Sequence, residues 1–120
     1  MKKKILIVDD SAFMRMMLKD ILTRAEYEAV GEAANGKAAL DLYSHLHPDL
    51  TLMDIVMPES DGLQALKEIL APDAHAAVIM LAVLGQECIA KECLQDGTKG
   101  YISKPFQQIP VLEAAKKLLG

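Results

Sequence analysis

The sequence predicts a doubly wound α/β fold, in which helices cover both faces of a parallel sheet. Apolar runs of strand length alternate five times with segments whose apolar residues recur at the three- and four-residue spacing of a helix. The connections between these segments are too short for anything but crossovers between neighbouring elements. With 120 residues, 52% of them hydrophobic, the chain is long enough to bury one core, so we expect a single domain over residues 1–120.

The first strand and helix follow each other directly at the N-terminal end. Ile5 to Val8 are four consecutive apolar residues, three of them β-branched, which is typical of a strand covered on both faces. Ser11 is placed to cap the next helix. Apolar residues then recur at helical spacing at Met14, Met17, Leu18, Ile21, Leu22 and Ala25.

The second and third pairs repeat this pattern with clear stop signals. Residues 28–33 (EAVGEA) predict a weaker strand, Asn35-Gly36 predicts a turn, and Pro48 ends the second helix. Residues 49–54 (DLTLMD) predict the third strand, and Pro72 closes the third helix. The apolar stripes of the two helices consist of Ala39, Leu42, Tyr43 and Leu46, and of Leu63, Leu66, Ile69 and Leu70.

The last two pairs contain the most apolar strand. Residues 77–84 (AVIMLAVL) predict a central strand, which Gly85 ends. A fourth helix is expected over residues 86–95, a fifth strand over residues 99–103, and a last helix over about residues 107–119. Five strands and five helices therefore alternate along the chain.

Charge and composition exclude several classes of protein. The net charge is −4, and the only basic cluster is Lys2–Lys4, so we expect no binding to nucleic acid or to an anionic membrane. The apolar run after these lysines ends at Asp9 after four residues, which is too short for a secretory signal. We therefore expect a cytoplasmic protein.

Charged residues gather at the predicted carboxyl ends of three strands. Asp9 and Asp10 end the first strand, Asp54 ends the third, and Lys104 follows the fifth. In a doubly wound sheet these ends meet at one edge, where ligands bind near the switch in strand order. The sequence therefore predicts that three carboxylates and one ammonium group converge at this edge.

Three clustered carboxylates repel one another, because each ionised group raises the pKa of the next. A divalent cation removes this conflict, and an all-oxygen site suits Mg²⁺ or Mn²⁺ better than zinc. A single aspartate at a strand end is more often an ordinary cap or turn residue. The coincidence of several charges at the ends of three strands favours a joint site over that simpler interpretation.

Three segments carry a resemblance to a known family. LIVDDSAFMR, LMDIVMPESDG and GYISKPF resemble, in order and spacing, the signature segments of two-component response regulator receiver domains, and most closely those of the single-domain chemotaxis regulators. The resemblance covers essentially the whole chain. It implies a flavodoxin-like sheet with the strand order 2-1-3-4-5 and five helices.

The resemblance also implies a role for each acidic residue. Asp54 would accept a phosphoryl group from a histidine kinase or a small phosphodonor. Asp10 and Asp54, with the backbone carbonyl of Val56, would hold Mg²⁺, and Asp9 would reach the ion through water. This role explains why adjacent carboxylates stand at the end of a buried strand.

The lysine and the proline that follow the fifth strand complete the implied site. Lys104 would pair with the phosphoryl oxygens, and a cis peptide between Lys104 and Pro105 would direct its side chain. Phosphoryl transfer needs mainly positioning and charge neutralisation, which a metal ion and an ammonium group supply. Cis peptides are essentially confined to proline, so this bond is a suitable place for one.

The chain departs from the family at its switch positions. Receiver domains carry Thr or Ser at the end of the fourth strand, where this chain has Ala82, and a small residue next, where it has Val83. Tyr101 matches the aromatic switch position. One hypothesis is that its ring sits inward even without phosphate, in the space that Ala82 leaves; the alternative, more common for a tyrosine, is a half-buried strand residue with a solvated hydroxyl. The missing hydroxyl favours impaired coupling between phosphorylation and conformation. The alternative is that changes elsewhere in the chain compensate for these substitutions.

The resemblance implies a signalling protein, not an enzyme. We expect a monomeric receiver that binds a histidine kinase and then a downstream target, such as the flagellar motor switch, through the face formed by the fourth helix, fifth strand and fifth helix. The alternative is a pseudo-receiver, a constitutive protein-binding module that is not phosphorylated. A flavodoxin-type cofactor site is disfavoured because the strand ends carry no Ser/Thr/Gly-rich phosphate loop.

Overall fold

A five-stranded parallel sheet forms the centre of the molecule. The computed structural model describes residues 2–57, 60–83, 85–86, 89, 91–92, 97–104 and 106–119. The strands of the sheet lie in the order β2-β1-β3-β6-β7, which confirms the predicted order 2-1-3-4-5. Their bounds are Lys4–Val8 for β1, Glu28–Ala33 for β2, Leu50–Asp54 for β3, Val78–Ala82 for β6 and Gly100–Ser103 for β7.

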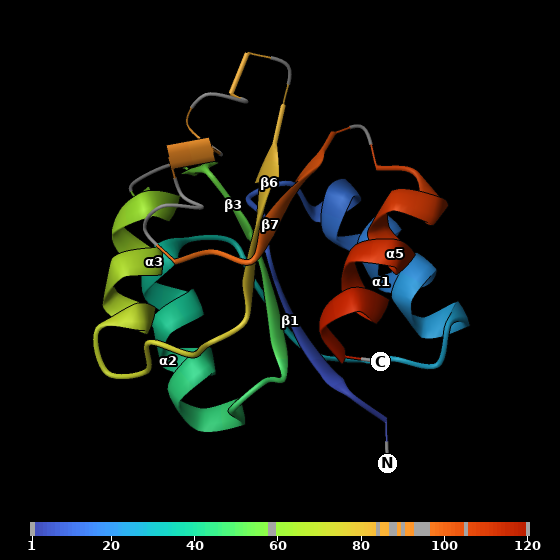
Figure 1. Ribbon diagram of the computed structural model, residues 1–120, viewed down its shortest axis with the longest axis horizontal. Helices are drawn as coiled ribbons and strands as arrows, with labels where there is room; N and C mark the ends of the chain where they lie inside the picture. The colour runs from blue at the N-terminus through green and yellow to red at the C-terminus, as the bar shows by residue number, and fades with distance from the viewer. Residues whose placement is uncertain are drawn as a thin grey trace.

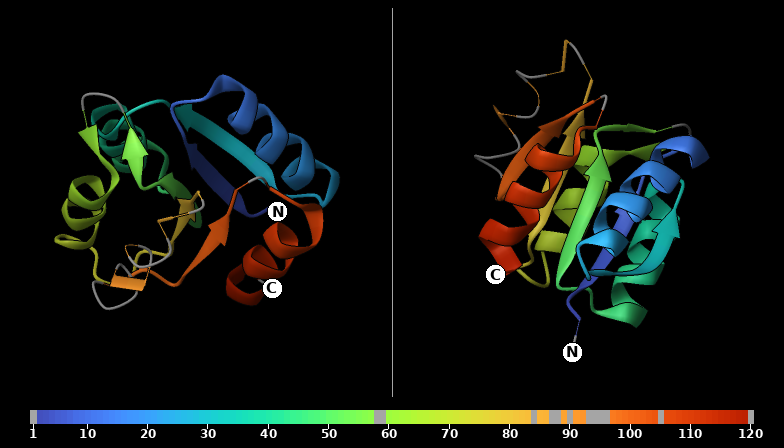
Figure 2. Two further views of the ribbon diagram at one scale, coloured as in Figure 1. Left: turned by 90° about the horizontal axis from the view of Figure 1, so that it is seen from above. Right: turned by 90° about the vertical axis from the view of Figure 1, so that its right-hand side faces the viewer.

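Helices cover both faces of this sheet, as Figures 1 and 2 show. Helices α1 (Ala12–Arg24) and α5 (Gln108–Leu119) lie on one face, and α2 (Gly36–Leu46) and α3 (Gly62–Leu70) lie on the other. The predicted fourth helix, 86–95, falls mostly outside the described residues, and its described positions 89, 91 and 92 are helical. Four of the five predicted helices are thus described in full.

The core divides into two layers because successive side chains of a strand point to opposite faces. In β1, Ile5 and Ile7 pack against α1 and α5, whereas Leu6 and Val8 pack against α2 and α3. Every residue of β3 and β6 is buried, as expected for strands covered on both faces. Burial on both faces explains why these strands appear in the sequence as continuous apolar runs.

The helix boundaries follow the capping residues in the sequence. The Ser11 hydroxyl accepts a hydrogen bond from the Met14 amide at 3.3 Å and caps α1, as predicted. Asn35 caps α2 in the same way, through the Ala38 amide at 2.9 Å. At the other end of α2, His47 adopts a left-handed conformation with φ of 46°, and Pro48 follows it. The helix therefore ends where the proline predicts.

The structure differs from the sequence prediction in two places. Strand β6 covers Val78–Ala82, where it pairs with β3 and β7, whereas the expected strand covered residues 77–84; residue 84 lies outside the described residues. A short antiparallel ladder, β4 (Val56–Met57) with β5 (Ser60–Asp61), lies between β3 and α3. Strands of two residues are too short to produce a periodic pattern, so the sequence did not predict them.

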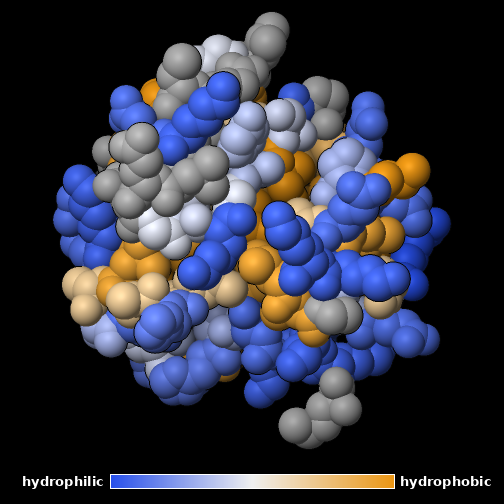
Figure 3. Space-filling view, in the orientation of Figure 1, coloured by the Kyte–Doolittle hydropathy of each residue, from blue (hydrophilic) through white to orange (hydrophobic). Residues whose placement is uncertain are grey.

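The face of the molecule drawn in Figure 3 carries many hydrophilic side chains. Figure 3 shows one face of the molecule, where polar side chains flank an apolar band between α3 and α5. Within the described part of the chain, none of the helices is both long and apolar enough to cross a membrane. Large apolar side chains exposed there are Phe13, Met16, Val83 and Ile109.

Candidate functional site

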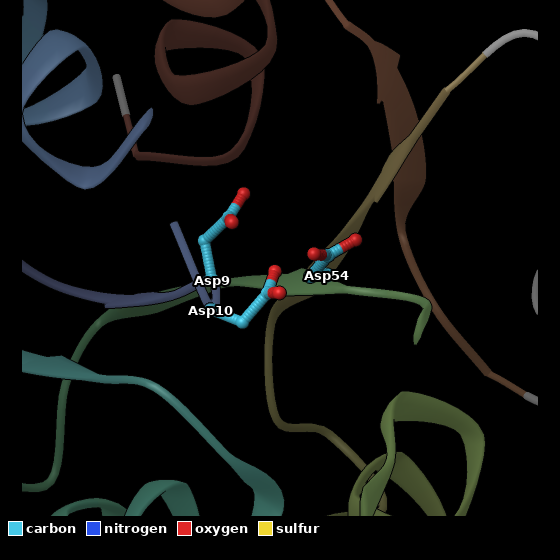
Figure 4. Close-up of side chains that lie close together, drawn as sticks. All are labelled: Asp9, Asp10 and Asp54. Carbon is cyan, nitrogen blue, oxygen red and sulfur yellow. The ribbon is translucent and has the colours of Figure 1, made fainter. Parts of the chain in front are cut away.

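Three carboxylates meet at the carboxyl ends of β1 and β3. These strands are neighbours, and pairing of Val8 with Met53 brings Asp9 and Asp54 to the same level of the sheet edge. One carboxylate oxygen from each of Asp9, Asp10 and Asp54 lies within 4.8 Å of the others. Figure 4 shows Asp10 and Asp54 directed toward the same space. Asp9 and Asp54 are buried, and Asp10 is exposed at the mouth.

Lys104 brings a positive charge to this cluster from the end of β7. Its Nζ lies 2.7 Å from Asp9 Oδ2 and 3.0 Å from Asp54 Oδ2. Its backbone amide donates to the carbonyl of Ala82 at 2.7 Å, which holds the lysine at the end of β6. The four charged residues selected from the sequence therefore lie together, with the ammonium between two of the carboxylates.

The amide, the carbonyl and the carboxylate of Asp9 each contact a neighbouring residue. Its amide donates to the carbonyl of Ala33 at 3.0 Å, and its Oδ1 accepts from the Ser11 amide at 2.9 Å. Its carbonyl accepts from Arg15 Nη1 at 2.6 Å. Beyond the ion pair with Lys104, Oδ2 has no hydrogen-bond partner among the described residues. The buried carboxylate thus depends on one lysine for its charge balance.

The protonation of Asp54 and Lys104 reflects this crowding. Burial raises the pKa of Asp54 from 3.8 to about 6, and the hydrogen bond and charge of Lys104 only partly oppose this rise. The charge of Asp9 and a hydrogen bond with Asp10 add to it. Burial by itself would lower the pKa of Lys104, but its contacts with Asp9 and Asp54 outweigh burial and raise it.

The donor set fits a hard divalent cation. Among the described residues, three carboxylates face the single ammonium group of Lys104, so the cluster keeps excess negative charge. All the available donors are oxygen atoms, and one of the carboxylates is exposed to water. Mg²⁺ prefers one or two carboxylates and retains several water ligands. The site therefore matches magnesium in charge, donor type and access.

The structure describes most of the remaining residues selected from the sequence. Val56 begins β4 two residues after Asp54, and nothing further tests its carbonyl as a ligand. Ala82 is buried at the end of β6, and Val83, next to it, is 40% exposed. Tyr101 is half-buried and packs against the core layer under α2 and α3, so the predicted inward ring stays a prediction. Pro105 and its predicted cis peptide lie outside the described residues.

Two residues of the site were missed in the sequence. Arg15 contacts the Asp9 carbonyl, and an arginine within an otherwise apolar stretch of helix, five residues after the acidic pair, is a signal for it. Gly62 donates its amide to the carbonyl of Ile55 at 2.9 Å. A Cβ at Gly62 would lie 2.6 Å from that oxygen and still closer to the carbonyl of Asp54. Only glycine fits there, and its place directly after Asp61 is the signal.

Comparisons with known proteins agree with this geometry. The family described as response regulator receiver domain matches residues 5–116. The chain is 50% identical over 118 residues to the chemotaxis protein CheY of Thermotoga maritima, covering 98% of each chain. It is 52% identical over 119 residues to CheY of Bacillus subtilis, covering 99% of each. A chain of the CheX-CheY-BeF3-Mg²⁺ complex from Borrelia burgdorferi, solved by crystallography, matches with a TM-score of 0.92 and 35% identity, covering 98% of this chain and 90% of that one.

Proposed function

Since this chain belongs to the response regulator receiver domain family, we propose that it accepts a phosphoryl group on Asp54 and signals by altered binding to a partner protein. The proposed donor is the histidine kinase of a chemotaxis-type two-component phosphorelay, and the receiver domain spans residues 1–120. One observation carries the proposal: Lys104 Nζ lies 2.7 and 3.0 Å from two members of a three-carboxylate cluster. Such a site neutralises charge where an anionic group is transferred.

The proposed transfer makes one bond and breaks another. A carboxylate oxygen of Asp54 attacks the phosphorus in line with the leaving group, so that a P–O bond forms while the P–N bond of the phosphohistidine breaks. The electron pair passes to the imidazole nitrogen, which takes up a proton. With its pKa raised to about 6, Asp54 is mainly ionised at pH 7.5 and can act as the nucleophile.

Asp10 and Asp54, with the carbonyl of Val56, are the proposed ligands that would hold Mg²⁺, and Asp9 would contribute through water. When bound, the ion would offset the negative charge of the carboxylates and of the phosphoryl oxygens. Lys104 supplies the second positive charge. Because its ammonium contacts Asp9 Oδ2 at 2.7 Å, the lysine stays in the site while Asp54 reacts.

Labelling with radioactive acetyl phosphate in Mg²⁺ tests this proposal. The wild-type protein should take up label that acid preserves and alkali removes, as expected for an acyl phosphate. Asp54→Asn should take up none, and EDTA should abolish labelling of the wild type. Equal labelling of Asp54→Asn would contradict Asp54 as the acceptor. No labelling of a folded wild-type protein would favour the pseudo-receiver.

We propose that phosphorylation shifts the conformation of this chain only weakly. The Ala82 side chain is buried at the end of β6 and offers no hydroxyl to a phosphoryl group on Asp54, which ends the adjacent strand. A ligand shifts an equilibrium only through contacts that differ between the two states. Ala82→Ser should therefore enlarge the amide chemical-shift changes that beryllofluoride causes in β7 and α5. Equal changes in both proteins would contradict impaired coupling.

The proposed target face includes β7 and α5. A groove runs along the end of β7 and the start of α5, which supports a docking role for this face. Its lining residues are Tyr101, Ile102, Ser103, Lys104, Gln107 and Pro110. The predicted fourth helix would complete the face, and it lies mostly outside the described residues. A flagellar motor switch as the target, the monomeric state and the cytoplasmic location stay predictions.

A further inference from the structure

One arginine ties the backbone of the acidic pair to two other segments. Arg15 lies in α1, and its Nη1 donates to the main-chain oxygen of Asp9 at 2.6 Å. Its Nε donates to Glu32 Oε1, on β2, at 3.1 Å. The Arg15 side chain is only 18% exposed, so its planar guanidinium is largely enclosed. The end of β1, the start of α1 and the end of β2 are thereby joined through a single group.

The contact with the Asp9 carbonyl determines the position of the next residue. The carbonyl of Asp9 and the amide of Asp10 belong to the same rigid peptide plane. A hydrogen bond that holds this oxygen therefore also restrains the direction in which the Asp10 backbone leaves the strand. Val8 is the last residue of β1 paired with β3, so the ladder with β3 no longer restrains this plane.

Asp10 needs such a restraint more than its neighbours. Asp9 and Asp54 are buried, and Lys104 contacts both, whereas Asp10 is the exposed member of the cluster. Its carboxylate must nevertheless stay within 4.8 Å of the other two for a shared cation. Restraint of its peptide plane limits the conformations that Asp10 adopts in the free protein. Less conformational entropy is then lost when its carboxylate binds an ion.

Glu32 keeps the guanidinium in the required orientation. Its carboxylate accepts a hydrogen bond from Nε of Arg15 and also lies 3.8 Å from Nζ of Lys19. The fork geometry of arginine allows one group to serve a carboxylate and a carbonyl at once, which a lysine ammonium on a flexible stem does less well. Lys19 neutralises the same carboxylate without any contact to Asp9 among those the structure describes.

We infer that Arg15 is a positioning residue for the metal site, which holds the Asp9–Asp10 peptide so that Asp10 can ligate a divalent cation. This inference rests on the magnesium site of the proposed function. The inference predicts a change in cation affinity opposite to the change that charge repulsion alone predicts. Removal of a positive charge beside an acidic cluster should by itself strengthen cation binding, whereas loss of a positioning contact should weaken it.

Titration of the whole protein with Mn²⁺, followed by the electron paramagnetic resonance of the free ion, separates these two effects. Arg15→Gln should raise the dissociation constant for Mn²⁺ about tenfold, the usual scale for loss of a group that orients a metal ligand. Lys19→Gln is the matched control, because it removes the same charge beside the same glutamate, and its Kd should stay within about twofold of the wild-type value on the same scale. An Arg15→Gln protein that binds Mn²⁺ as tightly as the wild type, or more tightly, overturns the inference.

Arg15→Lys keeps the charge and is the second variant. It should raise the dissociation constant at least about threefold, since its ammonium does not reproduce both hydrogen bonds. If circular dichroism shows that Arg15→Gln does not fold, Arg15→Lys decides, and an unchanged Kd overturns the inference. In acetyl phosphate labelling, Arg15→Gln should need more Mg²⁺ for half-maximal rate, while its rate at saturating Mg²⁺ stays close to the wild-type rate. A reduced rate at saturating Mg²⁺ with an unchanged half-maximal concentration overturns the positioning role.

An Asp10→Asn arm distinguishes failure of the inference from failure of the metal site itself. If the wild type binds no Mn²⁺, or if Asp10→Asn binds it as well as the wild type, the proposed metal site is wrong and the role of Arg15 falls with it. If the wild type binds Mn²⁺, Asp10→Asn does not, and both Arg15 variants match the wild type, only the inference about Arg15 is wrong.

Discussion

Replacement of Asp54 by asparagine should stabilise the metal-free protein, and the gain should depend on pH. Burial raises the pKa of this carboxyl from 3.8 to about 6, against the opposing effect of Lys104. The folded protein therefore keeps a proton that the unfolded chain releases. Under the linkage relation, the stability of the wild type falls as pH rises between about 4 and 6, and it levels off above that range. The asparagine side chain carries no ionisable proton, so the variant is free of this loss.

The size of the effect follows from the gap between the two pKa values. At about 1.36 kcal/mol per pH unit, the gap between 3.8 and about 6 corresponds to about 3 kcal/mol at pH 7.5 and about 1 kcal/mol at pH 4.5. Asparagine has nearly the same shape as a protonated aspartate. We therefore expect the free energy of unfolding of Asp54→Asn to exceed that of the wild type by about these amounts.

Urea unfolding in EDTA, followed by far-ultraviolet circular dichroism at several pH values, measures this difference. The chain has no tryptophan, so secondary structure is a better probe than fluorescence. Asp20→Asn is the matched control, because Asp20 has a side chain 60% exposed and pairs only with Arg24 on the helix surface among the described residues. Its effect should stay below about 1 kcal/mol at every pH. The reasoning is refuted if the difference in unfolding free energy between Asp54→Asn and the wild type does not change with pH, or if Asp54→Asn is the less stable protein at pH 7.5.

Four further outcomes follow from the same contacts. Excess Mg²⁺ at pH 7.5 should raise the melting temperature of the wild type and leave that of Asp54→Asn nearly unchanged, because a ligand stabilises only the state that binds it; equal shifts would contradict the site. Lys104→Gln should lower the free energy of unfolding in EDTA by about 3 kcal/mol at pH 7.5, since it leaves buried carboxylates unpaired. An equally large decrease in the free energy of unfolding at pH 4.5 would argue against this cause. Gly62→Ala should lose at least about 2 kcal/mol by urea unfolding, because its Cβ overlaps main-chain oxygens; unaltered stability would contradict the close packing. Burial first, and then the charge and hydrogen bond of Asp73, raise the pKa of Tyr43 to about 12, so Asp73→Asn should lower this pKa. An absorbance titration at high pH measures it, and an unchanged pKa would show that the contact with Asp73 is absent in solution.

The fold was largely readable from local patterns. Runs of apolar residues marked β1, β3 and β6 because strands covered on both faces must be apolar throughout. Capping and breaking residues marked the helix ends, as Ser11 and Pro48 illustrate. Strand β6 ends before the end of its apolar run, and β7 is only partly buried and carries no such run. The ladder of β4 and β5 was missed because two-residue strands produce no pattern.

The composition of the candidate site also followed from the sequence, since parallel strands bring their carboxyl ends to one edge. Asp9, Asp10, Asp54 and Lys104 all lie at the end of a strand or just after it, so topology alone predicted that they meet. Their environment was not predictable in this way. The raised pKa of Asp54 depends on how completely neighbouring elements exclude water from one side chain, which no local pattern records.

What the sequence determined by itself was the order of the elements and the kinds of charge at the ends of the strands, because both depend on the periodic burial of nearby residues. Only the tertiary structure decided that Lys104 spans Asp9 and Asp54, that Arg15 holds the Asp9 carbonyl, and that Gly62 lies against the main chain after β3. These contacts join residues far apart in the chain or depend on where a long side chain ends. Both are set by how strands and helices pack in three dimensions, to within a fraction of an ångström.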